Sequence, residues 1–240
     1  MKYSLIGLGA STLMVVALTA CGGGTAAAPA SAPASETATA APTPAKQYTD
    51  EELVALVKQI KASDGSSPAV LSGEELLDQF DPITDTFGKV AVEPAGCKDL
   101  GNLGVPQPVA GSTTAGTART KTNDFFSNVS LTSGVDVALL QENVDTRKSQ
   151  AEACKKVTFT AEGQSVTTST EKVDGVGSVP GTAAFKTLMV TPDGKTGAIY
   201  TAHVIKDGVL ISATSSGTEG AVGGPEAAGA LLDQAAALIK

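Results

Sequence analysis

Residue types that carry catalysis are sparse in this chain of 240 residues. His203 is the one histidine, which removes most zinc chemistry and most histidine-based general-base catalysis. It lies in the alternating stretch 199–205, in which both faces are partly apolar, so the pattern leaves its exposure open. A solvated or structural side chain is the usual outcome for such a histidine, and pH sensing or ligand contact is the alternative.

Short segments that look catalytic lack the rest of their motifs. Lys195-Thr196-Gly197 has the Lys-Thr-Gly order of penicillin-binding enzymes, but Ser-Asp-Asn occurs nowhere in the chain. Ser178 stands in a Gly/Pro loop, and the Gly-x-Ser-x-Gly elbow of hydrolases is absent. The glycine-rich segment 220–225 could present amides to an anion, but it lacks the lysine of a phosphate-binding loop. We therefore expect no catalytic residues.

The charged residues also point away from catalysis and from nucleic acid. Glu51, Glu52, Glu74 and Glu75 fall at expected helix starts, where negative charge complements the helix dipole. No Asp-rich loop has calcium-binding spacing, so we expect neither a metal nor another cofactor. The formal net charge of −8 argues against a nucleic-acid partner, whose phosphates require a surface rich in Lys and Arg.

The N-terminus reads as a bacterial export signal. An uncharged, largely apolar run of 14 residues, Leu5–Leu18, follows one lysine; a comfortable membrane span needs about 20. The run ends in Leu18-Thr19-Ala20-Cys21, which resembles the lipobox of bacterial lipoproteins. The resemblance implies a signal peptide over residues 1–20, cleavage between Ala20 and Cys21, and a diacylglyceryl group on Cys21 that anchors the protein to a membrane. An ordinary secretory signal with a chance cysteine is the alternative.

A low-complexity spacer separates this signal from the rest of the chain. Gly22 to Lys46 contains four prolines and no large apolar residue, so it cannot bury enough surface to offset the entropy of ordering. We expect residues 21–46 to be a disordered tether, which fully extended would reach about 80 Å. Residues 47–240 are expected to form one extracytoplasmic domain.

If Cys21 carries lipid, Cys97 and Cys154 remain as an even pair in an exported protein. Export places them in an oxidising compartment, where paired cysteines are normally bridged. We therefore predict a structural disulfide between them. The alternatives are two separate buried thiols and a redox pair, although the chain has no Cys-x-x-Cys.

Helix and strand signals alternate along the domain. The capping boxes Thr49-x-x-Glu52 and Ser72-x-x-Glu75 predict helices that end near residue 63 and before Pro82. Further helices are predicted over 145–156 and 226–239, whereas 101–118 reads as loop. Val90 and Val92 give a short apolar alternation, and the predicted strands are 157–161, 166–173, 184–190, 197–205, 209–214 and the two halves of a hairpin over 125–140.

Tight turns such as Pro192-Asp193-Gly194 and Asp207-Gly208 require antiparallel pairing of the strands that they join. Strands dominate the middle of the domain, with helices before, between and after them. We predict an α+β fold with a single antiparallel sheet of five to seven strands, helices packed on one face and one disulfide.

This layout resembles actinobacterial lipoproteins related to the extracellular sensor domain of the mycobacterial serine/threonine kinase PknH. In that family a capped helix precedes a Pro-x-x-Cys segment, here Pro94–Cys97, and a cysteine ends a middle helix before a strand, here Cys154 before Val157-Thr158-Phe159. A C-terminal meander and a last helix close the domain. The resemblance spans about residues 70–240 and implies an α+β domain with a cleft, presented outside the membrane, that binds a ligand.

We therefore expect a membrane-anchored, non-enzymatic binding or sensor-like module with an unidentified small-molecule, lipid or protein ligand. A structural or chaperone-like interaction lipoprotein is the alternative, which an exposed apolar patch without a deep cavity would favour. A hydrolase is the third possibility. It would be favoured by a Ser, Thr or Lys within reach of His203 or of a buried carboxylate, beside two anion-stabilising amides.

Replacing Cys21 by Ala tests the lipid anchor. The variant lacks the sulfur that would accept the diacylglyceryl group, so it should not incorporate a labelled fatty acid and should be held less firmly in the membrane fraction. Metabolic labelling followed by fractionation measures both properties. A variant that is labelled and retained like the parent would show that the lipobox interpretation is wrong.

Overall fold

The computed structural model describes residues 45–98, 103–122, 125–221 and 224–240. The predicted signal peptide, its cleavage site at Ala20 and Cys21, and nearly all of the predicted tether lie outside the described residues. In the part of the chain that is described, no helix has both the length and the apolarity needed to cross a bilayer.

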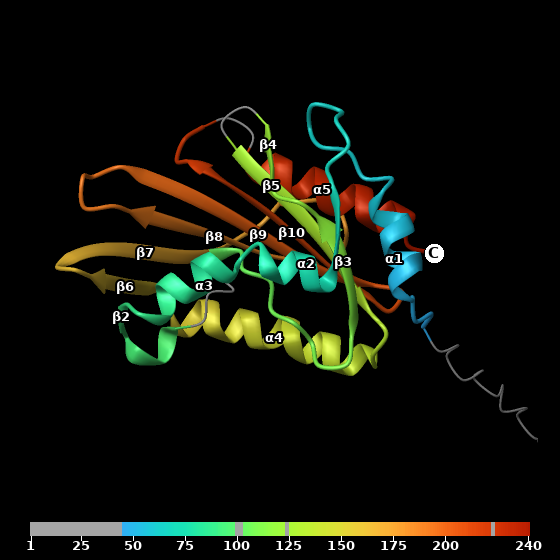
Figure 1. Cartoon of the computed structure of the whole chain (residues 1–240), viewed down its shortest axis with the longest axis horizontal. Helices are drawn as coiled ribbons and strands as arrows, with labels where there is room; N and C mark the ends of the chain where they lie inside the picture. The colour runs from blue at the N-terminus through green and yellow to red at the C-terminus, as the bar shows by residue number, and fades with distance from the viewer. Residues whose placement is uncertain (1–44, 99–102, 123–124, 222–223) are drawn as a thin grey trace, which may run out of the picture. The chain divides into compact units, whose positions relative to one another are not determined.

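One antiparallel sheet of ten strands runs through the described residues (Figure 1). The strands are β1 (Val70–Ser72), β2 (Ala91–Glu93), β3 (Thr113–Thr117), β4 (Thr120–Thr122), β5 (Phe125–Ser133), β6 (Lys156–Ala161), β7 (Gln164–Val173), β8 (Ala183–Val190), β9 (Thr196–Lys206) and β10 (Val209–Thr218). Nine of them follow the order β1-β3-β5-β10-β9-β8-β7-β6-β2, and β4 pairs with β5 beside this path. The α+β class and the antiparallel sheet are confirmed.

The predicted count of five to seven strands is wrong. Three short strands near one end of the sheet, β1, β3 and β4, were missed. β1 and β4 have three residues each, too few for an alternating pattern to be recognised. β3 lies within the segment 101–118 that was predicted as loop, and its small residues are needed there. A Cβ on Gly116 would lie 3.2 Å from the Leu76 methyl groups and 2.7 Å from the Val129 carbonyl oxygen.

Five α-helices and one 3-10 helix occur in the described residues. They are α1 (Asp50–Val57), α2 (Gly73–Asp78), α3 (Asp81–Gly88), η1 (Ala95–Cys97), α4 (Val137–Ala153) and α5 (Gly224–Leu238). Both predicted capping boxes are formed, at Thr49 and at Ser72. The sequence did not predict α3, which has Pro82 in its first turn. A proline is tolerated there because an N–H at that position would have no partner within the helix.

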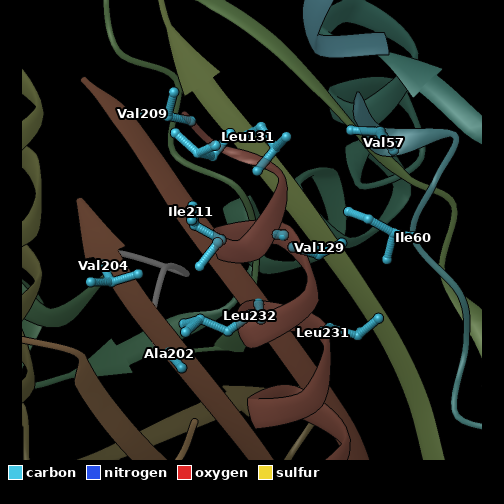
Figure 2. Close-up of a cluster of buried hydrophobic side chains, with 14 of the residues drawn as sticks. Val57, Ile60, Val129, Leu131, Ala202, Val204, Val209, Ile211, Leu231 and Leu232 are labelled. Carbon is cyan, nitrogen blue, oxygen red and sulfur yellow. The ribbon is translucent and has the colours of Figure 1, made fainter. Parts of the chain in front are cut away.

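Helices cover both faces of the sheet, so the prediction of helices on one face is wrong (Figure 1). On one face α1 and α5 pack against the sheet in an aliphatic core, which includes Val57, Ile60, Val129, Leu131, Ala202, Val204, Val209, Ile211, Leu231 and Leu232 (Figure 2). On the other face Leu140 and Val144 of α4 pack with Phe185 and Leu210. Leu210 and Ile211 belong to different cores because successive strand residues point to opposite faces.

Residues 73–98 and 103–112, which we call the covering segment, lie over the α4 face of the sheet in two passes. β1 and β2 are at opposite ends of the strand order, so α2 and α3 lead from one edge to the other. The chain then returns to β3, the neighbour of β1. Contacts near Gly116 and Gly104 place both passes on this face: Leu76 lies against Gly116, and Gly104 lies against Thr214.

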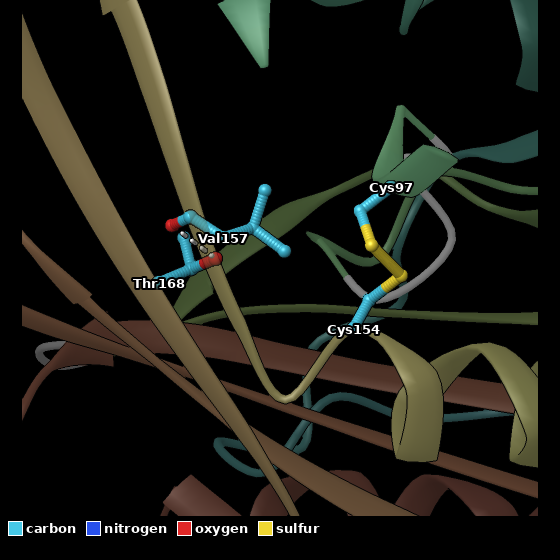
Figure 3. The surroundings of a disulfide bond; sticks show 4 residues. All are labelled: Cys97, Cys154, Val157 and Thr168. Carbon is cyan, nitrogen blue, oxygen red and sulfur yellow. Dashed lines mark hydrogen bonds between the residues drawn. A yellow bond between two sulfur atoms is a disulfide. The ribbon is translucent and has the colours of Figure 1, made fainter. Parts of the chain in front are cut away.

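A disulfide joins Cys97 of the covering segment to Cys154 at the C-terminal end of α4 (Figure 3). The two Cα atoms are 5.7 Å apart, and the predicted pairing is confirmed. Both ends lie beside β6, where the Thr168 hydroxyl of the neighbouring strand donates to the Val157 carbonyl oxygen (3.4 Å). The bridge therefore holds the covering segment against α4 at the β2 edge of the sheet.

Replacing both Cys97 and Cys154 by Ser should lower the free energy of unfolding by up to about 4 kcal/mol, because the unfolded chain loses a long covalent loop. Urea denaturation without reductant measures the difference. The parent treated with reductant is the matched control and should unfold like the double variant. A double variant as stable as the oxidised parent would contradict the role given to the bridge.

Candidate functional site

A cavity of about 410 Å³ lies between the covering segment, α4 and the sheet. We call it the Arg147 cavity. β3, β5 and β10 form its sheet side, α2 and residues 106–109 lie across from them, and Arg147 of α4 lines it as well. Its volume falls within the range of small-molecule sites, which extends from about 300 to about 1,000 Å³.

The lining combines apolar, hydroxyl-bearing and charged side chains, to which Gln107 adds an amide. The apolar members are Leu76, Leu77, Pro106, Pro108, Val109 and Leu210. The hydroxyl-bearing members are Ser72, Ser112, Thr114, Ser130, Thr132 and Ser212. Charge is supplied by Arg147 and by two carboxylates on exposed helix starts, Asp50 and Glu74. Such a lining suits a ligand that is partly apolar and carries a polar group.

The hydroxyl groups on the sheet side follow from strand register. Ser130 of β5 lies directly opposite Ser212 of β10, and Ser212 lies opposite His203 of β9, so the three side chains form one row on the α4 face. Nδ1 of His203 is 2.9 Å from Oγ of Ser212. In the next row the hydroxyl oxygens of Thr114 and Thr132 are 3.1 Å apart.

His203, at one end of this row, is buried, with 4% of its surface exposed. Burial lowers the pKa of its imidazole well below the ordinary value, and the positive charge of Arg147 lowers that pKa further. The ring is therefore neutral near pH 7. The sequence left the exposure of His203 open. In the structure α4 covers that face of β9 and buries the side chain.

Arg147 brings a buried positive charge to the cavity. It lies on α4 with 8% of its surface exposed, and its Nε donates to Oδ1 of Asn143 one turn earlier (2.9 Å). The sequence analysis did not single it out. A signal was available, because Leu140, Val144, Arg147 and Ala151 share the buried helical spacing of α4. A cation on an otherwise apolar stripe is a candidate site residue.

The contact between Ser212 and His203 supplies one part of a hydrolase geometry, but its electrostatics oppose catalysis. In a Ser-His-Asp triad a carboxylate stabilises the imidazolium that forms when the base takes the serine proton. Here the charged neighbour that acts on His203 is a cation, which destabilises the imidazolium. Ser212 also lies within a strand paired on both sides, so nearby amides bond to β5 and β9 rather than forming an oxyanion hole.

The structure places the other catalytic-looking segments outside the Arg147 cavity. Lys195, in the turn before β9, pairs with Asp193 on the surface. The Ser178 amide donates to the Asp233 carboxylate (2.8 Å). Ser169 and Lys172 have Ser-x-x-Lys spacing, which the sequence analysis passed over, but they lie on a strand, where that spacing points them to opposite faces.

Two further expectations concern the glycine-rich segment and metal ions. Residues 222–223 of the segment 220–225 lie outside the described residues. In the described ranges, no three His, Cys, Asp or Glu side chains are grouped closely enough to hold a metal ion.

Comparison with solved structures finds a similar fold in a mycobacterial extracellular domain. The crystal structure of the extracellular domain of PknH from Mycobacterium tuberculosis matches with a TM-score of 0.50 at 16% sequence identity, over 79% of this chain and 97% of that chain. The expected likeness is thus confirmed for the fold. An uncharacterised protein from Mycobacterium smegmatis, an orthologue of Rv0999, matches with a TM-score of 0.39 at 18% identity, over 72% and 85% of the two chains. No protein-family model and no curated protein sequence matches the chain.

The depressed pKa of His203 predicts a pH dependence of stability. Since the unfolded chain binds this proton near pH 6.5 and the folded chain only at lower pH, the free energy of unfolding should fall as pH drops below 6.5. The slope from this group is at most about 1.4 kcal/mol per pH unit. A His203→Asn variant should lose that component.

Urea denaturation of both proteins between about pH 7 and about pH 5 gives the comparison. The exposed carboxylates titrate in both proteins, so their effect cancels in the difference. Equal pH dependence in parent and variant would contradict the neutral, buried state of His203.

Proposed function

We propose that this chain is a lipid-anchored extracytoplasmic protein whose folded domain binds a small molecule in the Arg147 cavity without transforming it. The observation that carries the proposal is the cavity itself: about 410 Å³, lined by apolar residues, hydroxyl groups and one buried cation. Such a combination of an apolar wall with a few oriented polar groups is typical of ligand sites.

The proposed location outside the membrane is supported by the N-terminal sequence, the disulfide and the fold. The export signal and the lipobox, ending at Ala20 and Cys21, suit a protein held at the outer face of a bacterial membrane. The disulfide between Cys97 and Cys154 suits an oxidising compartment. The likeness in fold to the extracellular domain of PknH agrees with the same side of the membrane.

Binding without turnover is favoured over hydrolysis because the site lacks an activated base. Burial and the charge of Arg147 keep the pKa of His203 low, so His203 is a poor acceptor for the Ser212 proton. The role of the histidine is then to orient the Ser212 hydroxyl at the cavity wall.

An interaction lipoprotein without a ligand site is the competing function. It would be favoured by a continuous apolar surface. Among the described residues, the exposed large hydrophobic side chains are Phe126, Val137, Leu139 and Val190, which come from three different elements. This scatter supports the binding module over the interaction protein.

A neutral fluorescent probe tests whether the cavity binds ligands. The sample is the predicted mature chain, residues 21–240 with Cys21→Ser, which needs no detergent because it lacks the lipid. N-phenyl-1-naphthylamine should become fluorescent on binding to it. A Thr114→Phe variant should weaken binding at least about tenfold by filling the cavity, since this half-buried threonine lines it.

Thr167→Phe is the matched control, because this threonine is also half-buried on a strand but does not line the Arg147 cavity. It should bind the probe like the parent. Absence of probe binding to the parent, or equal loss in both variants, would mean that the Arg147 cavity is not a ligand site.

A further inference from the structure

We infer that the ligand of the Arg147 cavity is an uncharged amphipathic molecule, with a hydroxyl group bound between Ser130 and Ser212 of the sheet and an apolar body against α2 and residues 106–109. The inference deepens the proposed function and rests on it. It specifies the polar group of the ligand, its charge and its orientation in the cavity.

The first step concerns Ser130, which lies in β5 and lines the Arg147 cavity with 8% of its surface exposed. Six hydroxyl-bearing residues line the cavity, and five of them use the hydroxyl group in a hydrogen bond within the protein. Ser130 is the sixth, and its hydroxyl group has no hydrogen-bond partner in the described part of the chain. Buried hydroxyl groups normally have a partner, so this one is suited to a bond with a ligand.

The second step concerns Ser212, which lies directly opposite Ser130 on β10. Its Oγ is 2.9 Å from Nδ1 of His203. A hydroxyl group has one donor and two acceptor positions, so Ser212 can still accept a hydrogen bond whichever nitrogen of His203 carries the proton. Ser130 can donate one. Directly opposite side chains start about 5 Å apart, so one ligand hydroxyl can donate to Ser212 and accept from Ser130.

The third step concerns the charge of the ligand. Removing a charged head group from water costs free energy unless the charge is paired. The two serines are neutral and so is His203, and Arg147 is already engaged within the protein, where its Nε donates to Asn143. Asp50 and Glu74 line the cavity from exposed positions, and their carboxylates repel an anion. A neutral hydroxyl group avoids both costs.

The fourth step concerns the rest of the ligand. Leu76 and Leu77 of α2 and the prolines Pro106 and Pro108 line the same cavity, and their side chains offer no hydrogen-bond donors. An apolar body gains free energy there in proportion to the area that it removes from water. The hydroxyl group of the ligand therefore points to the sheet and its apolar body to the covering segment.

Two isomeric ligands test the hydroxyl contact on residues 21–240 with Cys21→Ser. 1-Octanol ends in a hydroxyl group, whereas 1-methoxyheptane has the same atoms but an ether oxygen that cannot donate. Both should displace N-phenyl-1-naphthylamine from the Arg147 cavity. 1-Octanol should do so at a concentration at least about threefold lower, as expected for one additional hydrogen bond, although water solvates the ether less well.

Two charged ligands of the same chain length test the requirement for a neutral head group. Octanoate and octylammonium should each need at least about a tenfold higher concentration than 1-octanol to displace the probe at neutral pH, because placing the head group against the two serines removes its charge from water. Both comparisons use the parent alone, so they need no folded variant.

Ser130→Ala should abolish the preference for 1-octanol over 1-methoxyheptane and leave the affinity for N-phenyl-1-naphthylamine within about threefold of the parent value. It should unfold at the same urea concentration as the parent, because the hydroxyl group that it removes has no partner within the described residues. Ser127→Ala is the matched control, since Ser127 is a serine of the same strand, 5% exposed, that points to the opposite face. It should keep the preference.

Three results would overturn the inference while leaving the proposed function in place. They are equal displacement by the alcohol and the ether, displacement by a charged ligand as strong as that by 1-octanol, and a preference for the alcohol that survives Ser130→Ala or is lost equally in Ser127→Ala. Failure of the parent to bind N-phenyl-1-naphthylamine would instead overturn the proposed function.

Discussion

The constraint on which this structure depends is that the central strands are covered on both faces. In β5 the residues from Ser127 to Ser133 are all buried, on whichever side they point. One face is filled by α1 and α5, mostly with aliphatic side chains, and the buried hydroxyl groups of Ser133 and Ser215 on that face bond to backbone groups. The other face is covered by α4 and the covering segment, which do not fill it completely. The cavity is the space that remains between them.

The polar groups in that space are costly to bury, so each is expected to have a partner or a specific role. A buried cation is expensive to remove from water and is retained where it has a specific role or partner. The Nε of Arg147 donates to Asn143 in its own helix, which restrains the side chain. His203 avoids a second desolvated charge by remaining neutral, and it satisfies Nδ1 with Ser212. These contacts hold the side chains in place, and for the binding proposed above such organisation would lower the entropic cost.

The sequence predicted those parts of the fold that depend on local chemistry. Capping boxes marked two helix starts, and Asp207-Gly208 marked the turn between β9 and β10, because these signals act within a few residues. Edge strands such as β1 were missed because their pairing depends on distant partners. The start of α4, residues 137–140, was wrongly predicted as part of a strand because Val135, Val137 and Leu139 occur at alternate positions, yet Val137 and Leu139 are exposed on the helix. The cavity could not be predicted, since strand register alone brings Ser130, Ser212 and His203 into one row.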